Sequence, residues 1–274
     1  GVGSSTTSEI LLLDADVQNP KPQTFLKREQ GHEYFVNIHN DGFYILTNKD
    51  AENKKVVFSK TIPTSIDKCE TIIAHSNDRL IENIVVAHNY LFAEERNNGL
   101  EQIRLMDLTT KKSDYITVNE ETYTIGLWEN SDYMTTSVEY RYNSMTTPTS
   151  IYRQDLKSGK KDLIFQYELL DKNFKSADYE SKRIWATAND GTKIPISIVY
   201  KKGTNLAEAP CLLYGYGSYG YTIPDVFSAT RLSLLNRGFV YALAHIRGEK
   251  YLGEQWYQKG KFLAKRNAFG DFIN

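Results

Sequence analysis

The strongest constraint on the fold is a strand-like run that ends in a polar turn and recurs along the first 155 residues. With Asp14, Ser59, Asp107 and Asp155 taken as the last residue of each run, the spacings are 45, 48 and 48 residues. That period is about the length of one four-stranded β-propeller blade. One blade cannot bury both of its faces alone, so blades stack around an axis. The spacing therefore favours a propeller over a β-sandwich, with only a closing strand in the first repeat.

The residues between these turns are typical of β-strands. The chain has 19 tyrosines and 12 phenylalanines, and aromatic residues favour strands. Turn-forming clusters such as Asn40-Asp41-Gly42, Asn97-Asn98-Gly99 and Lys157-Ser158-Gly159 separate short apolar runs. An incomplete propeller leaves strand edges unpaired, which predicts self-association. The expected strands are Glu9–Asp14, Gly42–Thr47, Lys55–Thr61, Tyr90–Glu94, Gln102–Leu108, Met134–Tyr140 and Ile151–Leu156.

The pattern changes after residue 175 to one of alternating strands and helices. The turn Asn189-Asp190-Gly191 predicts a β-hairpin, and the run Phe239–Ile246 is typical of a strand buried on both faces. Strands and helices in alternation indicate an α/β layer. The other expected elements are strands at Tyr179–Ala188, Lys193–Tyr200 and Cys211–Tyr214, helices at Phe227–Asn236 (with Gly238 just past its end) and Glu254–Lys265, and a last helix capped by Asn267 with Phe269, Phe272 and Ile273 on its apolar face.

Composition excludes several classes of function. The chain has 33 basic and 34 acidic residues and a net charge of -1, which argues against binding to nucleic acid or a membrane surface. No secretory signal is visible, and no apolar run approaches the length of a membrane span. Cys69 and Cys211 are predicted to be reduced, buried thiols. The five histidines have no zinc-binding spacing, so we expect no metal and no cofactor.

A glycine-rich turn after the strand Cys211–Tyr214 admits two functional interpretations. Gly215, Gly217 and Gly220 fit the G-x-G-x-x-G pattern of a dinucleotide-binding loop, but no helix follows directly and no acidic residue ends the next strand. The alternative is a loop that stabilises an oxyanion, as in α/β-hydrolases. Ser218 is not a nucleophile by pattern, because Tyr216 stands where G-x-S-x-G requires its first glycine.

Several longer motifs stand in one order along the chain: Arg183–Tyr200, Tyr214–Gly220, Arg231–Ala242, His245–Gly248 and Leu252–Tyr257. Together they resemble the prolyl oligopeptidase family, and within it oligopeptidase B (protease II). Because they occur in the family's order, the resemblance is specific. The implied fold is mixed β and α/β: residues 1–175 form the C-terminal part of a β-propeller of about four blades or fewer, and residues 176–274 begin an α/β-hydrolase domain.

The resemblance implies a cytoplasmic serine peptidase that hydrolyses short peptides after Lys or Arg. It gives Tyr216 the role of hydroxyl donor to the oxyanion, whereas Tyr214 and Tyr219 are assigned to packing and His245 to a structural position. The family's Ser, Asp and His would lie beyond residue 274, so these residues alone are expected to be an inactive fragment. The alternative function is a non-catalytic propeller-type binding module or a decayed gene product.

One position departs from the family's pattern. Relatives usually carry a further glycine after the equivalent of Arg247-Gly248, where this chain has Glu249-Lys250. If the backbone there has positive φ, glutamate would strain the loop. The sequence therefore predicts either a rebuilt loop or a site under less functional constraint.

Overall fold

The computed structural model describes residues 1–4 and 6–273 and divides into two compact units. Unit 1 comprises residues 1–95, 104–114 and 132–135, and unit 2 comprises residues 96–103, 115–131 and 136–274. Across the described residues, no helix has the length and apolar character that a membrane span requires.

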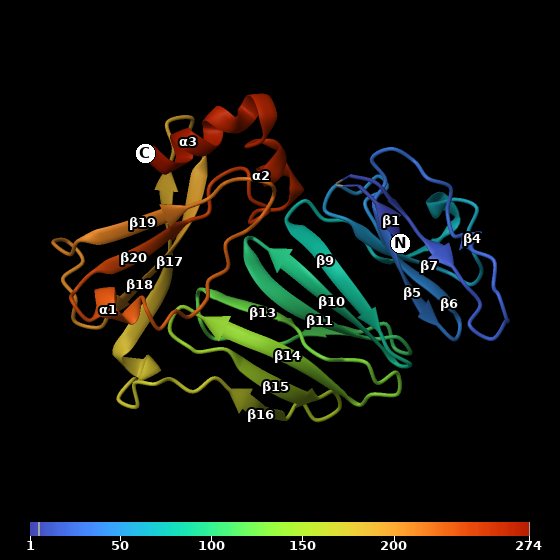
Figure 1. The fold of residues 1–274 in the computed structure, drawn as a ribbon, viewed down its shortest axis with the longest axis horizontal. Helices are drawn as coiled ribbons and strands as arrows, with labels where there is room; N and C mark the ends of the chain where they lie inside the picture. Colours follow the sequence, from blue (N-terminus) through green and yellow to red (C-terminus); the bar gives the residue numbers. More distant parts are fainter. Residues whose placement is uncertain (5, 274) are drawn as a thin grey trace. The chain divides into compact units, whose positions relative to one another are not determined.

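Three four-stranded antiparallel sheets make up most of the first 166 residues (Figure 1). Each is a meander whose strands follow chain order, as in a propeller blade, so the predicted repeating unit is confirmed. Two short two-stranded sheets precede them: β1 (Val2–Gly3) with β2 (Ser8–Glu9), and β3 (Leu11–Leu12) with β4 (Gln23–Thr24). The meanders are β5 (Tyr34–His39), β6 (Gly42–Thr47), β7 (Lys55–Ser59) and β8 (Glu70–Ile73); β9 (Arg79–Val86), β10 (Tyr90–Asn97), β11 (Leu100–Asp107) and β12 (Ser113–Tyr115); and β13 (Tyr123–Leu127), β14 (Ser137–Ser144), β15 (Ser150–Asp155) and β16 (Lys161–Gln166).

The recurring aspartates owe their spacing to a shared turn. Asp107 Oδ1 accepts hydrogen bonds from the backbone N–H groups of Thr109 and Thr110. Asp155 Oδ1 accepts equivalent bonds two and three residues on, at Lys157 and Ser158. The Thr110 N–H lowers the pKa of Asp107, and the Ser158 hydroxyl, followed by the Ser158 N–H, lowers the pKa of Asp155. Each aspartate thus ends the third strand of its sheet and starts the turn to the fourth.

The core of unit 1 comes from the inward faces of two of these sheets. Its fully buried residues include Val56 on β7, Ile81 on β9, and Leu91 and Ala93 on β10. Alternating strand residues point to one face, so a short β-rich segment supplies several core side chains. The other members of this cluster are Tyr44, Leu46, Ile73, Ile84 and Met106.

The C-terminal half of unit 2 contains a mixed sheet with the strand order β17-β18-β20-β19 (Figure 1). β17 (Tyr179–Thr187) and β18 (Lys193–Lys201) form the predicted hairpin, and Gly191 has φ 84° in its turn. β20 (Val240–Ala244) lies between β18 and β19 (Cys211–Gly215), antiparallel to the first and parallel to the second. Its central place explains the continuous apolar run.

The predicted helices are shorter than expected. The helix predicted over Phe227–Asn236 is only α1 (Leu232–Leu235), because the preceding residues form turns and Phe227 packs against Phe174. The helix predicted over Glu254–Lys265 ends as α2 (Glu254–Gln258). It breaks at Gly260, where an added Cβ would overlap the backbone of residues 247–248.

The prediction that Asn267 caps the last helix is wrong. α3 (Lys265–Ile273) begins two residues earlier, and the Asn267 side-chain amide donates instead to the carbonyl of Lys259. Of its expected apolar face, Phe272 packs into the core of unit 2, whereas Phe269 and Ile273 are exposed.

Self-association through strand edges stays a prediction. β16 lies at the edge of its sheet and all six of its residues are exposed. Leu163, Ile164 and Phe165 are each about half exposed on this strand. An apolar edge of this kind is a template for pairing with another strand.

Candidate oxyanion site

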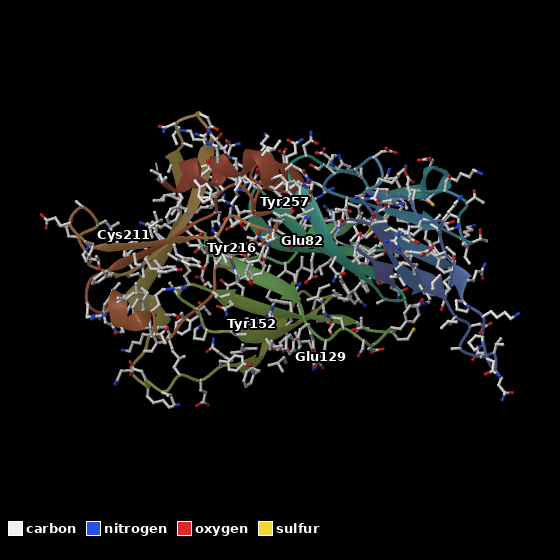
Figure 2. The ribbon with its side chains drawn as sticks, turned by 45° about the horizontal axis from the view of Figure 1, so that its top comes forward. Glu82, Glu129, Tyr152, Cys211, Tyr216 and Tyr257 are labelled. Carbon is white, nitrogen blue, oxygen red and sulfur yellow. The ribbon has the colours of Figure 1, made fainter. Side chains whose placement is uncertain are left out.

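Tyr216 is placed by the strand that precedes it. β19 pairs in parallel with β20 up to Gly215, which lies opposite Ala244, so Tyr216 is the first residue beyond the paired strand. Its side chain is 42 % exposed, and its ring contacts Tyr221 edge-on with centroids 6.2 Å apart. Figure 2 marks its position in the chain. Tyr216 is therefore partly exposed and not a core aromatic.

Lys265 from α3 secures the turn that carries Tyr216. Its ammonium donates to the Ser218 hydroxyl at 2.7 Å and to the carbonyl of Gly217. Burial lowers the pKa of Lys265 below its ordinary value. Ser218 is thus a turn residue held by a cation, in keeping with its failure to match a nucleophile motif.

The assignment of Tyr219 to packing is wrong. This residue is 87 % exposed and has φ 59°, so the turn projects it into solvent. Tyr214 is 44 % exposed on β19. Tyr214 and Tyr216 are thus similarly exposed, and Tyr219 is far more exposed than either.

The loop of residues 246–250 forms the floor beneath this turn. The Gly220 N–H donates to the Gly248 carbonyl at 2.9 Å, and a Cβ on Gly217 would lie 2.6 Å from the Ile246 side chain. Gly248 has φ 101°, and a Cβ there would overlap the carbonyl of Gly217. Only glycine permits this close approach of the two backbones.

The backbone at Glu249 does not have the positive φ that would strain a glutamate there. Among the described non-glycine residues, those with positive φ do not include Glu249, because Gly248 takes that conformation one residue earlier. The Glu249 side chain instead turns inward and is fully buried. The loop therefore accommodates glutamate as a buried acid.

Arg247 ties the same loop to two other elements. Its guanidinium forms paired contacts of 2.5–3.0 Å with Asp271 in α3 and a 2.7 Å contact with Asp190 in the β17–β18 turn. The backbone N–H of Arg247 also donates to Asp271. Asp271, followed by Asp190, raises the pKa of Arg247, while hydrogen bonds from Thr192 and then Arg247 lower the pKa of Asp190 to about 2.

A buried Ser–His–Glu arrangement lies behind the loop. The Ser197 hydroxyl lies 3.0 Å from Nε2 of His245, and Nδ1 of His245 lies 3.4 Å from Glu249. All three residues are 0 % exposed, and Ser197 also donates to Asp225 at 2.9 Å. This spacing resembles a hydrolytic triad. With all three groups closed off from solvent, however, a substrate has no access to the serine, and the arrangement is structural, as predicted for His245.

Sequence reasoning missed four residues that build this region: Ser197, Asp225, Lys265 and Asp271. Ser197, Lys265 and Asp271 are remote in sequence from the glycine-rich turn, whereas Asp225 follows it closely. One signal was available: Ser197 is a polar residue inside the otherwise apolar strand of residues 194–200. A buried polar residue needs a partner, so its position pointed to a polar network.

The charge of His245 makes the stability of unit 2 depend on pH. Burial alone would lower the pKa of His245, but Asp225 and Glu249 outweigh it and raise the pKa. For Glu249, burial raises the pKa, and His245 and the Gly217 N–H offset part of that rise. Both groups then hold protons more tightly in the folded state than in the unfolded state. The stability that each group contributes is complete below its pKa in the unfolded chain. It is lost as pH rises through the pKa of that group in the folded protein.

We therefore expect the free energy of unfolding of unit 2 to fall as pH rises above about 4.3, the ordinary Glu pKa, and to fall further above about 6.5, the ordinary His pKa. Each pKa unit of difference between the two states contributes about 1.4 kcal/mol. All three tryptophans, Trp128, Trp185 and Trp256, belong to unit 2, so urea unfolding followed by tryptophan fluorescence measures it. Glu249→Gln removes one anion beside His245 and should flatten the pH slope. An unchanged slope would contradict this assignment.

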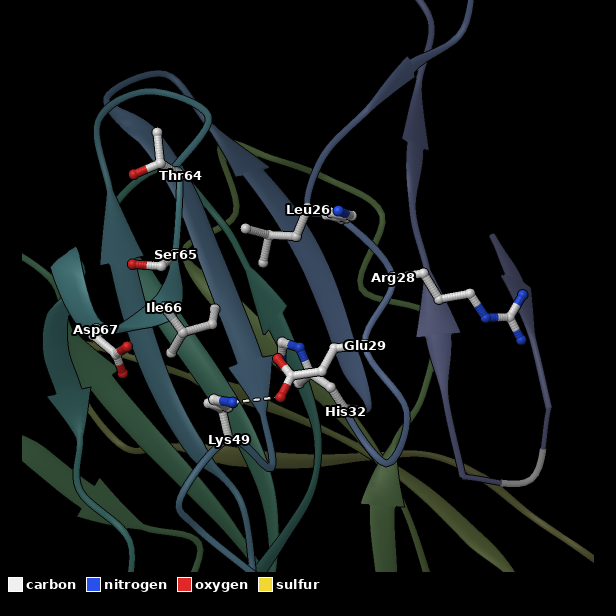
Figure 3. A pocket seen from close by; sticks show the side chains of 10 residues that line it. Leu26, Arg28, Glu29, His32, Lys49, Thr64, Ser65, Ile66 and Asp67 are labelled. Atoms are coloured by element: carbon white, nitrogen blue, oxygen red, sulfur yellow. Dashed lines mark hydrogen bonds and ion pairs between the residues drawn. The ribbon is translucent and has the colours of Figure 1, made fainter.

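Unit 1 contains a pocket of about 360 Å³, and the chain has two cysteines. In this pocket Lys49 pairs with Glu29 at 2.6 Å (Figure 3). Cys69 and Cys211 are both free thiols, but the prediction that both are buried is wrong, because Cys211 is exposed on β19. In the described part of the chain, no group of three or more His, Cys, Asp or Glu side chains is arranged to hold a metal ion.

Comparison with known proteins identifies the relatives of this chain. The family model described as "Prolyl oligopeptidase, N-terminal beta-propeller domain" matches residues 1–166, and that of the "Prolyl oligopeptidase family" matches residues 225–274. The interval between them is unmatched, so the domain boundary at 175/176 stays a prediction.

Individual relatives agree with these matches. Dipeptidyl aminopeptidase BI of Pseudoxanthomonas mexicana is 39% identical over 90% of this chain and 34% of its own length. Protease 2 of Moraxella lacunata is 31% identical over 98% of this chain and 39% of its own. The structure of oligopeptidase B from Trypanosoma brucei, in its closed form with covalently bound antipain, superposes with a TM-score of 0.91 at 35% identity over 99% of this chain and 40% of that one. The chain thus spans well under half the length of these relatives, and it belongs to the prolyl oligopeptidase family, with a propeller portion followed by the start of the hydrolase domain.

Proposed function

We propose that these residues form part of a cytoplasmic serine peptidase similar to oligopeptidase B, which cleaves short peptides after Lys or Arg. The observation that carries the proposal is the placement of Tyr216 directly beyond β19, half exposed, on a turn held by Lys265 and Gly248. Similarity to protease 2 and oligopeptidase B along nearly the whole chain supports the substrate class.

The chemical role of Tyr216 follows from how a peptide bond is broken by a serine. Attack on the carbonyl carbon converts the carbonyl oxygen to an oxyanion, and a donor placed at that oxygen stabilises the transition state. The Tyr216 phenol is such a donor. In this proposal the nucleophile, base and carboxylate are supplied by parts of the full-length protein outside these 274 residues. The Ser197–His245–Glu249 set does not replace them, because it is closed to substrate.

The experiment separates this portion from the full-length protein. Each is incubated with a chromogenic peptide ending in Arg or Lys and with a serine-directed fluorophosphonate probe. We expect turnover and labelling of the full-length protein, and neither for the purified 274-residue chain. Labelling of the short chain would show that it contains a reactive serine and would overturn the proposed division of roles.

Ser218 gives a further prediction. Because Lys265 keeps its bond to the Gly217 carbonyl when the Ser218 hydroxyl is removed, the turn should hold, and Ser218→Ala should change the kcat of the full-length protein by less than about threefold. Probe labelling should remain complete. Loss of labelling in the variant would make Ser218 the nucleophile and contradict the assignment.

A further inference from the structure

Tyr251 extends the buried Ser197–His245–Glu249 set toward a second part of unit 2. Its ring stacks on the His245 ring with centroids 3.7 Å apart and an interplanar angle of 11°. Tyr251 is 2% exposed, and His245 and Glu249 are fully buried. Stacked rings in a close-packed interior have little freedom to move independently. Tyr251, His245 and Glu249, which lies 3.4 Å from His245, are called here the buried stack. We treat them as one rigid body.

One end of the buried stack supports the Tyr216 turn. Glu249 forms an isolated parallel bridge with Gly220, and the neighbouring carbonyl of Gly248 accepts from the Gly220 N–H. A hydrogen bond from the Gly217 N–H to the Glu249 carboxylate also lowers the pKa of Glu249. The turn itself carries three glycines, which give it little rigidity of its own. The position of Tyr216 therefore depends on what lies beneath the turn.

The other end of the buried stack contacts the tip of the β10–β11 hairpin. Asn98 and Gly99 have φ of 48° and 87°, which fits a tight two-residue hairpin turn. A Cβ added at Gly99 would overlap the Tyr251 ring. Nη1 of Arg183 donates to the Asn98 carbonyl at 2.5 Å, and the Arg96 guanidinium lies 6.0 Å from the Tyr251 ring centroid. The tip is thus fitted closely against Tyr251.

We propose that the buried stack is a positioning device for Tyr216, and that contact of the Asn98-Gly99 tip with Tyr251 holds it in its working place. The inference rests on the proposed oxyanion role of Tyr216. The tip meets Tyr251, and we infer that its effect reaches the turn through Tyr251, His245 and Glu249. A displaced stack shifts the glycine-rich turn and moves the phenol away from the oxyanion, while substrate binding elsewhere is unaffected. The signature is a loss in kcat with little change in KM.

The test uses Gly99→Ala in the full-length protein, with Gly203→Ala as its matched control. Both glycines have similar positive φ, 87° and 88°, but a Cβ at Gly203 meets nothing within 4 Å. Both variants bear the same backbone strain, and only Gly99→Ala displaces Tyr251. We expect Gly99→Ala to lower kcat by about tenfold per folded active site, with KM within about twofold, because small misplacements of catalytic groups are costly. Gly203→Ala should leave both constants unchanged.

Combination with Tyr216→Phe separates positioning from a general structural effect. In the Tyr216→Phe background there is no phenol to place, so Gly99→Ala should lower kcat by less than about twofold more. If Gly99→Ala does not fold, Tyr251→Leu removes the same contact from the other side and should give the same kcat loss and the same lack of additivity.

Each outcome has a distinct meaning. Full kcat in both Gly99→Ala and Tyr251→Leu, or losses that multiply with that of Tyr216→Phe, would overturn the positioning role and leave the proposed function intact. If Tyr216→Phe alone keeps full kcat, the oxyanion role fails, and the inference fails with it.

Discussion

Tyr216→Phe is expected to lower the kcat of the full-length peptidase by about a hundred- to a thousand-fold, with KM changed by less than about threefold. The substitution removes one hydroxyl and keeps the ring, so the edge-on contact with Tyr221 should survive. The hydrogen bond in question strengthens as charge develops on the carbonyl oxygen. Its loss therefore appears in the rate of the chemical step rather than in substrate binding. Steady-state kinetics with an Arg peptide measures both constants.

Tyr219→Phe is the matched control for this result. Tyr219 lies in the same turn, three residues on, but is 87 % exposed and points into solvent. The kcat of the Tyr219→Phe variant should stay within about twofold of that of the parent protein. Equal losses in the two variants would indicate damage to the turn rather than removal of a specific donor.

The second large effect is expected from Asp271→Ala. This change leaves the buried Arg247 guanidinium without its paired carboxylate, and breaking a buried ion pair costs about 3–5 kcal/mol. The contact to the exposed Asp190 remains and compensates only in part, because it reaches one nitrogen of the guanidinium. Urea unfolding followed by tryptophan fluorescence reports the loss in unit 2.

Asp162→Ala provides the comparison for that measurement. Asp162 pairs with Lys160 at 2.9 Å, but both side chains are more than half exposed. Exposed ion pairs contribute little to stability, so this variant should unfold at nearly the parental urea concentration. A similar loss in Asp162→Ala and Asp271→Ala would show that burial does not determine the strength of the Arg247 pair.

Local signals predicted much of the fold. The hairpin at Gly191 and the strand Gly42–Thr47 were found with their bounds nearly unchanged. The repeat was readable because Asp107 and Asp155 each start the same hydrogen-bonded turn, and such turns leave a local pattern. Edge strands such as β12 and β16 were not predicted.

The errors have a common physical cause, which is tertiary packing overriding local propensity. Gly260 breaks a predicted helix because its backbone packs against residues 247–248. The candidate site shows the same limit. Tyr216 and its turn were identified from local motifs, whereas the Ser197–His245–Glu249 arrangement was not, because strand pairing brings together residues about 50 positions apart. Glu249 was read as a possible source of strain because its burial beside His245 has no local signature.

The proposed cleavage after Lys or Arg is tested most directly by kcat/KM of the full-length protein. The peptides compared differ only in the residue before the cleaved bond. Lys, Arg, Pro and Ala at that position distinguish the branches of the family. We predict cleavage after Arg and Lys at least about a hundred times more efficient than cleavage after Pro or Ala, since a site that pairs with a charge discriminates strongly against residues lacking it. Preference for Pro or Ala, or absence of cleavage for all four peptides, would contradict the proposed specificity for Arg and Lys.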